Sequence, residues 1–89
     1  MKQLIKRHYN ATAKRGYIND KTIMRDFLLK IKEEYDEASD AFEAGDFRDC
    51  VDEIVDIAAV CMNTLEHFGY DFEKEYLTNV EYQETRSLN

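Results

Sequence analysis

Two pairs of acidic residues carry the strongest chemical signal in the sequence. Glu34 and Glu37 are three residues apart, and so are Glu53 and Asp56. Residues three apart on an α-helix lie on the same face, so each pair would present two carboxylates side by side. Four carboxylates on rigid helices suit a hard cation. Mg²⁺ is therefore expected, or Mn²⁺, with water or phosphate oxygens completing its coordination.

Asp56 is the most informative of these acids, because it stands inside the apolar run of residues 54–60. Burying a lone carboxylate is costly or forces it to take up a proton. A bound cation would remove that cost, so we expect Asp56 to be a buried ligand. The alternative is that the acids are ordinary surface charges on amphipathic helices, and this is favoured for Glu33, Asp36 and Asp40.

Other metal sites and a disulfide do not fit the sequence. Zinc would need cysteine or histidine at ligand spacing, which the chain lacks. Carboxylate di-iron bundles use Glu-x-x-His pairs, and neither His8 nor His67 follows such a glutamate. Cys50 and Cys61 lie in one expected helix, roughly 16 Å apart, too far for a disulfide. Reduced thiols are typical of a cytoplasmic protein.

The elements that must position the acids are helices. The chain has 89 residues, no proline and three glycines, so long helices joined by short turns are expected. They would form one domain spanning residues 1–89. The apolar periodicity predicts an all-α fold with four helices, over residues 2–14, 22–44, 47–68 and 72–86.

The two central helices are expected to form an antiparallel hairpin that brings the acid pairs together. Gly45 suits the left-handed end of the first of them. Asn19 or Asp20 would cap the first at its N-terminus, and Asp46 the second. Apolar residues recur along the first helix at steps of three or four, which predicts one buried stripe made of Ile23, Phe27, Ile31, Tyr35, Ala38 and Phe42.

The third helix predicts self-association. Its middle, residues 54–62, is apolar nearly all the way round. Such a helix is normally buried on every side, and a chain this short offers too little of its own surface to do that. We therefore expect oligomerisation to complete the bundle, as a homodimer or a homotetramer.

Charge and hydropathy exclude several classes of partner. The net charge is −7, whereas proteins that bind nucleic acids through the phosphate backbone are basic. No stretch approaches the length of a membrane span, and residues 1–14 lack the apolar core of a signal peptide. No nucleic acid, no membrane and a cytoplasmic location are expected.

The acid pattern resembles the signature of a known enzyme family. Glu34-x-x-Glu37, fifteen residues, then Glu53-x-x-Asp56 is similar to the motif of the MazG-like, all-α nucleoside triphosphate pyrophosphohydrolases. Residues 30–38, 52–57 and 67–71 resemble the flanking segments of that family, and the resemblance covers residues 26–86. It implies a four-helix MazG-like bundle in which the four acids hold Mg²⁺.

The resemblance also implies an activity and roles for further residues. The enzyme would hydrolyse a nucleoside triphosphate, ribo- or deoxyribo-, to the monophosphate and pyrophosphate, and its role would be housekeeping of the nucleotide pool. Glu33 or Glu37 would act as the catalytic base. Arg86, with Gln83 and Asn79, would bind the substrate from the last helix, and His8 would help to bind the base.

Two departures from the family pattern leave an alternative open. Asn79 and Gln83 stand where the family usually has a lysine and an asparagine. Loss of the lysine removes a point charge aimed at phosphate, so a non-catalytic member that binds nucleotide or protein is the alternative. A third hypothesis is a helical dimerisation module without a ligand.

Overall fold

The described part of the chain is all-helical. The computed structural model describes residues 1–86, and within them it has four helices and no strand. The all-α prediction is therefore confirmed, with each helix end within two residues of the expected position. The helices are α1 (Lys2–Lys14), α2 (Met24–Glu43), α3 (Phe47–His67) and α4 (Phe72–Arg86).

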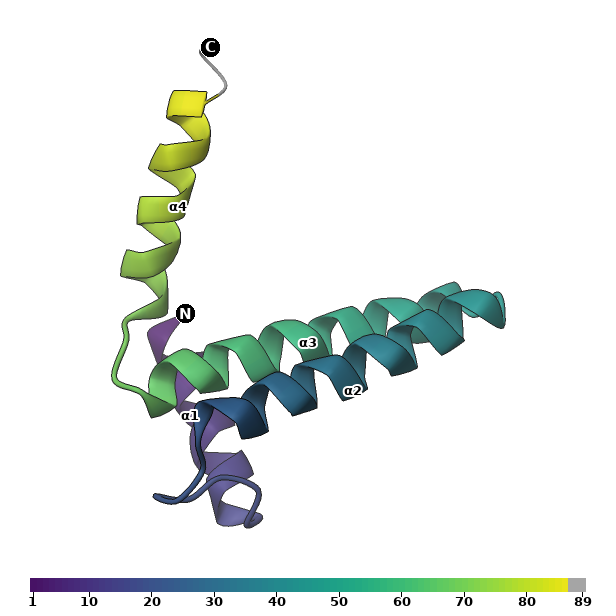
Figure 1. Ribbon diagram of the computed structural model, residues 1–89, viewed down its shortest axis with the longest axis horizontal. Helices are drawn as coiled ribbons and strands as arrows, with labels where there is room; N and C mark the ends of the chain where they lie inside the picture. The colour runs from purple at the N-terminus through teal and green to yellow at the C-terminus, as the bar shows by residue number, and fades with distance from the viewer. Residues whose placement is uncertain (87–89) are drawn as a thin grey trace.

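The helices α2 and α3 form the predicted hairpin and lie side by side over their whole length (Figure 1). Gly45 has a φ of +76°, a left-handed conformation that other residues adopt at a cost. The next residue, Asp46, begins α3 as its N-cap, because its carboxylate accepts a hydrogen bond from the backbone N–H of Asp49 at 2.9 Å. Both predictions for this corner are confirmed.

The predicted N-cap of α2 was wrong. Neither Asn19 nor Asp20 caps this helix: its N-cap is Ile23, whose backbone N–H donates to the carboxylate of Asp26 at 2.9 Å. Asn19 instead accepts a hydrogen bond from the backbone N–H of Lys21 at 2.8 Å. Such a local turn competes with helix formation, so the connection runs three residues further than the cap rule suggests.

The predicted apolar stripe of α2 was only partly right. Phe27 and Ala38 are buried, but Tyr35 and Phe42 are 61% and 69% exposed, and Ile23 is exposed as well. The buried seam runs instead through Phe27, Glu34, Ala38 and Ala41. The reason is that α2 packs against the single helix α3 along a narrow line, so the large residues one position further round remain outside it.

A polar network fixes α1 across the end of α3. The Nε2 of His67 donates to the carbonyl oxygen of Thr22 at 2.9 Å, so its Nδ1 accepts from the hydroxyl of Tyr9 at 2.7 Å. The Nδ1 of His8 donates to the amide oxygen of the buried Asn63 at 3.1 Å. These bonds hold α1 and the segment before α2 against the end of α3, beside the buried ring of Phe27, whose centre lies 5.1 Å from that of the His67 ring.

The last helix, α4, rises away from the hairpin at the carboxyl end of α3 (Figure 1). Every residue of α4 after Phe72 is exposed. Within residues 1–86, no helix is both long and apolar enough to cross a lipid bilayer.

Candidate metal centre

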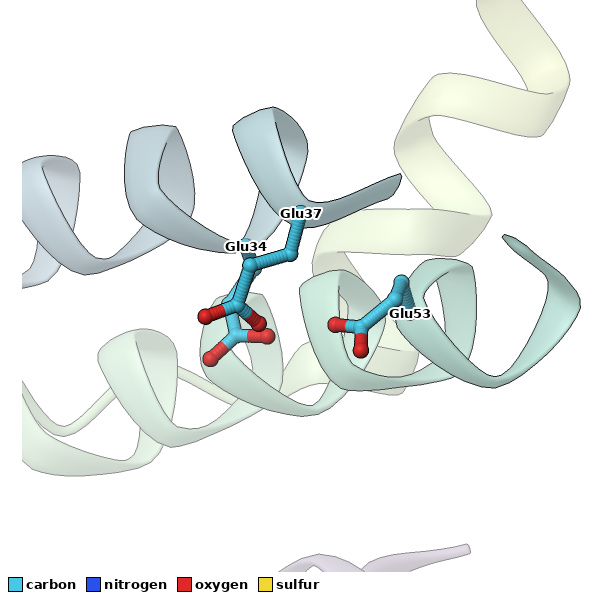
Figure 2. A group of neighbouring side chains, drawn as sticks. All are labelled: Glu34, Glu37 and Glu53. Atoms are coloured by element: carbon cyan, nitrogen blue, oxygen red, sulfur yellow. The ribbon is translucent and has the colours of Figure 1, made fainter. Parts of the chain in front are cut away.

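Three glutamates from two helices meet at the middle of the hairpin. Glu34 and Glu37 project from α2, and Glu53 projects toward them from α3 (Figure 2). One carboxylate oxygen from each lies within 4.8 Å of the other two. The antiparallel hairpin therefore brings three of the four predicted metal ligands together.

The carboxylates of Glu34 and Glu53 each leave one oxygen without a partner. Glu34 is 8% exposed, because it lies in the seam between α2 and α3. Its Oε2 atom and the Oε2 atom of Glu53 are both buried and accept no hydrogen bond. A buried, unsatisfied carboxylate oxygen is costly, and a cation between the two helices would satisfy both atoms.

The other oxygen of Glu34 is already engaged. Lys30, one helical turn earlier on α2, places its Nζ 3.2 Å from Glu34 Oε1 and 3.4 Å from Glu33 Oε1. Partial burial disfavours the ammonium, but the hydrogen bonds to both glutamates and their charges outweigh it and raise the pKa of Lys30. Lys30 thus holds Glu34 in position through Oε1 and leaves Oε2 without a hydrogen-bond partner.

Glu53 has a strongly perturbed pKa. Burial disfavours its charged form most. Hydrogen bonding to the carboxylates of Glu34 and Glu37 favours the protonated form, and the charges of Glu37 and Asp56 repel a further negative charge. Together these effects raise the pKa of Glu53 from 4.5 to about 7. In the absence of a cation the cluster therefore retains a proton near neutral pH.

This shift predicts a pH dependence of stability in metal-free protein. Because folding raises the pKa of Glu53, the folded state binds more protons than the unfolded state between about pH 4.5 and about pH 7. Its contribution to stability is complete below that range and is lost as the pH rises through it. Urea unfolding with a chelator present should show this loss in the native chain and a smaller loss in Glu53→Gln; equal slopes would contradict the shift.

The fourth predicted ligand, Asp56, lies beside the cluster and outside the group of three. It is one turn after Glu53 on α3, close enough for its charge to act on the pKa of Glu53. The expectation that Asp56 is buried was wrong: it is exposed, as are its neighbours Ile54 and Val55, at 54% and 60%. The helices of the same chain cover only part of the apolar run of α3, and the side that carries Asp56 is not covered.

The two candidate bases both lie on the exposed side of α2. Glu37 belongs to the cluster, whereas Glu33 is paired with Lys30. Both are exposed to solvent, so either carboxylate is accessible to a water molecule.

The predicted substrate-binding residues are spread over two other helices. His8 lies on α1 at an open groove of about 710 Å³ between α1 and α3, which Arg7 and Asn10 also line. The helix α4 runs away from the hairpin (Figure 1), so Asn79, Gln83 and Arg86 are not brought to the cluster within one chain. The guanidinium of Arg86 lies over the ring of Tyr82, 5.6 Å from its centre.

The sequence analysis missed Lys30 and Asn63. Lys30 precedes Glu34 by four residues, a spacing at which opposite charges on a helix interact, so the pattern was available. Asn63 gives no comparable signal, because its burial at 4% exposure depends on where α1 crosses α3.

In comparisons with protein-family models, with curated proteins and with solved structures, nothing matches this chain. The likeness to the MazG-like family accordingly stays a prediction from the sequence motif.

Proposed function

We propose that this protein is a Mg²⁺-dependent nucleoside triphosphate pyrophosphohydrolase, built as a MazG-like bundle. The observation that supports the proposal best is the convergence of Glu34, Glu37 and Glu53, with two buried oxygens left unpartnered. An acidic cluster alone is common on protein surfaces. A glutamate that is only 8% exposed, and that has one carboxylate oxygen within 4.8 Å of oxygens from two other glutamates, is not.

The donor set selects the type of cation. All three groups are carboxylates, which prefer hard ions such as Mg²⁺ and Mn²⁺. Glu34, Glu37 and Glu53 would hold the ion, and Asp56 stands one turn along α3 to join them. The bound ion would neutralise triphosphate charge and lower the pKa of a bound water.

The remaining steps belong to the chain's own side chains. Glu33 or Glu37 would take the proton from the attacking water. His8, at the mouth of the groove between α1 and α3, would contact the nucleobase. Arg86, with Gln83 and Asn79, would reach the triphosphate from an α4 helix of the assembled protein. The substrate would be a ribo- or deoxyribonucleoside triphosphate, cleaved to the monophosphate and pyrophosphate.

The active form would be a homo-oligomer in the cytoplasm. Large apolar side chains remain exposed on α2, α3 and α4, and a second copy would cover them. Removal of surplus nucleotides would be its role there.

Pyrophosphate release from a panel of nucleoside triphosphates, with Mg²⁺ or Mn²⁺, tests this proposal. Pyrophosphate with a matching amount of monophosphate is the expected product. Orthophosphate with the diphosphate would place the cut at the other phosphoanhydride, and no product from any nucleotide would overturn the activity.

A non-catalytic nucleotide-binding protein is the second candidate. Asn79 and Gln83 favour it, because neither supplies the positive charge that phosphate transfer uses. That candidate predicts saturable binding of a nucleotide with Mg²⁺ and no release of pyrophosphate in the same sample.

A further inference from the structure

The side-chain amide of Asn63 is buried in one fixed orientation. Asn63 lies on α3 where α1 packs against that helix, and it is only 4% exposed. The hydroxyl of Thr12 donates its one hydrogen to the backbone carbonyl of His8 at 2.9 Å, so toward Asn63 it can only accept. The Nδ2 of Asn63 donates to this hydroxyl oxygen at 3.4 Å. The amide oxygen Oδ1 therefore faces His8, 3.1 Å from its Nδ1.

This orientation fixes the tautomer of His8. Because Oδ1 of Asn63 can only accept a hydrogen bond, the hydrogen of the neutral ring is on Nδ1 of His8. Nε2 then carries a lone pair, and its position across the ring directs it away from the buried amide. His8 is exposed, and its Nε2 has no hydrogen-bond partner among residues 1–86. The exposed edge of His8 is thus a hydrogen-bond acceptor, whereas His67 has the opposite tautomer, with its hydrogen on Nε2.

His8 lies at a groove that suits a flat heteroaromatic ring. The groove between α1 and α3 has a volume of about 710 Å³ and is lined mainly by apolar side chains, among them Leu4, Ile5 and Met62. Apolar walls with a few fixed polar groups are typical of small-molecule sites. A ring seated there would bury its faces against the apolar side chains and turn one edge toward Nε2 of His8.

The groove lies further along α3 than the acidic cluster, on the side of that helix that carries Asp56. Asp56, Ala59 and Asn63 follow one another at steps of three and four residues, so they lie on one side of α3, and Ala59 lines the groove. Asn63 is ten residues from Glu53, or roughly 15 Å along the helix axis. A ligand with phosphates at the cluster and a ring in the groove would lie along this line.

We propose that Asn63 is a positioning residue, which holds His8 as an acceptor so that the groove selects nucleobases with an amino group over those with a carbonyl at the same ring position. An amino group donates to Nε2, whereas a carbonyl oxygen would face it lone pair to lone pair and lose its hydrogen bond to water. Adenine and cytosine carry the amino group, and hypoxanthine and uracil carry the carbonyl. The selection rests on the proposed function, which places the phosphates of the same nucleotide at the cluster.

The tautomer can be measured without nucleotide or metal. The chain has two histidines, so ¹⁵N NMR can resolve their ring nitrogens, at about pH 8.5 where an imidazole is ordinarily neutral. The hydrogen of His8 should be on Nδ1. The hydrogen of His67 should be on Nε2, because this atom donates to the carbonyl of Thr22 at 2.9 Å.

Two substitutions of Asn63 separate the positioning role from a structural one. Asn63→Leu has no acceptor, so His8 should shift toward the Nε2–H form that free histidine favours, while His67 stays unchanged as an internal reference. Asn63→Asp keeps an acceptor oxygen for Nδ1 and should retain the Nδ1–H form. A purely structural role would change both histidines or neither.

Affinities for two matched pairs of nucleotides measure the selection. ATP and ITP differ in the amino or carbonyl group of the ring, and so do CTP and UTP. In calorimetric titrations with Mg²⁺, the pair that binds more tightly should show a Kd at least about tenfold lower for its amino member, the scale of one hydrogen bond. Asn63→Leu should bring this ratio near one, and Asn63→Asp should keep it. A change at the cluster alters both Kd values of a pair, because both members share the triphosphate.

Each part of the proposal has a result that would overturn it. Hydrogen on Nε2 of His8 in the native protein would contradict the role of Asn63. An Nδ1–H tautomer with equal Kd values within both pairs would contradict the selection and leave the proposed function standing. Binding of none of the four nucleotides would overturn the selection together with the nucleotide function, and the NMR spectrum would still decide the tautomer.

Discussion

Glu53→Gln is expected to reduce pyrophosphate release at least about 100-fold, the scale of losing one preorganised electrostatic group in an active site. Glu53 is the only member of the cluster that α3 supplies, so without its charge no cation is held between the two helices. Glutamine keeps the size of the side chain, so the hairpin should still form. Steady-state turnover of the best nucleotide, at saturating Mg²⁺, measures the effect.

Asp52→Asn is the matched control for this variant. Asp52 precedes Glu53 on α3, is exposed, and pairs with Arg48 at 2.7 Å, away from the cluster. An exposed pair of this kind contributes about 1 kcal/mol or less, so turnover should stay near the native value. Equal losses in the two variants would show that general charge on α3 matters and that the cluster has no special role.

Mg²⁺ is expected to reverse the order of stability of the native protein and Glu53→Gln. Without a divalent cation the variant should melt at the higher temperature, because it lacks one of three crowded carboxylates and removes a buried, unsatisfied oxygen. With Mg²⁺ at 100 times its Kd, binding stabilises the native fold by about 2.7 kcal/mol. For a domain of this size that corresponds to a rise in Tm on the order of 10 °C.

Thermal unfolding followed by circular dichroism, first with a chelator and then with Mg²⁺, shows which of the two proteins has the higher Tm in each condition. The variant should gain little from the cation. The native protein should therefore have the lower Tm of the two with the chelator and the higher Tm with Mg²⁺. If both proteins gain equally, Mg²⁺ acts elsewhere on this acidic chain. If neither gains and the variant is the more stable throughout, a dimerisation module without a ligand accounts for the fold.

The sequence was sufficient for features that a short stretch of chain determines by itself. The glycine corner and the cap at Asp46 depend on a few adjacent residues, and Glu34, Glu37 and Glu53 converge because helical periodicity and an antiparallel turn leave little choice. The hairpin could therefore be predicted together with three of its proposed ligands.

Features that depend on a packing partner could not be predicted in the same way. Glu34 and Tyr35 are adjacent, and which of them enters the seam depends on the rotation of α2 against α3. Hydrophobicity favoured Tyr35, whereas the structure buries Glu34 and leaves Tyr35 exposed. The prediction that Asp56 is buried was wrong for a related reason, because its apolar neighbours face outward in the single chain.

The direction in which α4 leaves the hairpin could not be predicted from the sequence either. Its exposed apolar residues, such as Tyr76 and Leu77, do not favour one side strongly enough to fix it against the hairpin. Its helical boundaries were predicted because Gly69, with a φ of +80°, separates it from α3.

Binding of Mn²⁺ to the purified protein, followed by electron paramagnetic resonance of the free ion, tests the central claim most directly. Mn²⁺ takes the place of Mg²⁺ among oxygen ligands. The native chain and Asp52→Asn should each bind about one ion per chain, and Glu34→Gln should lose that binding, because its buried Oε2 atom is a proposed ligand. Equal binding by all three proteins, or none by the native chain, would show that the glutamates between α2 and α3 are not a metal centre.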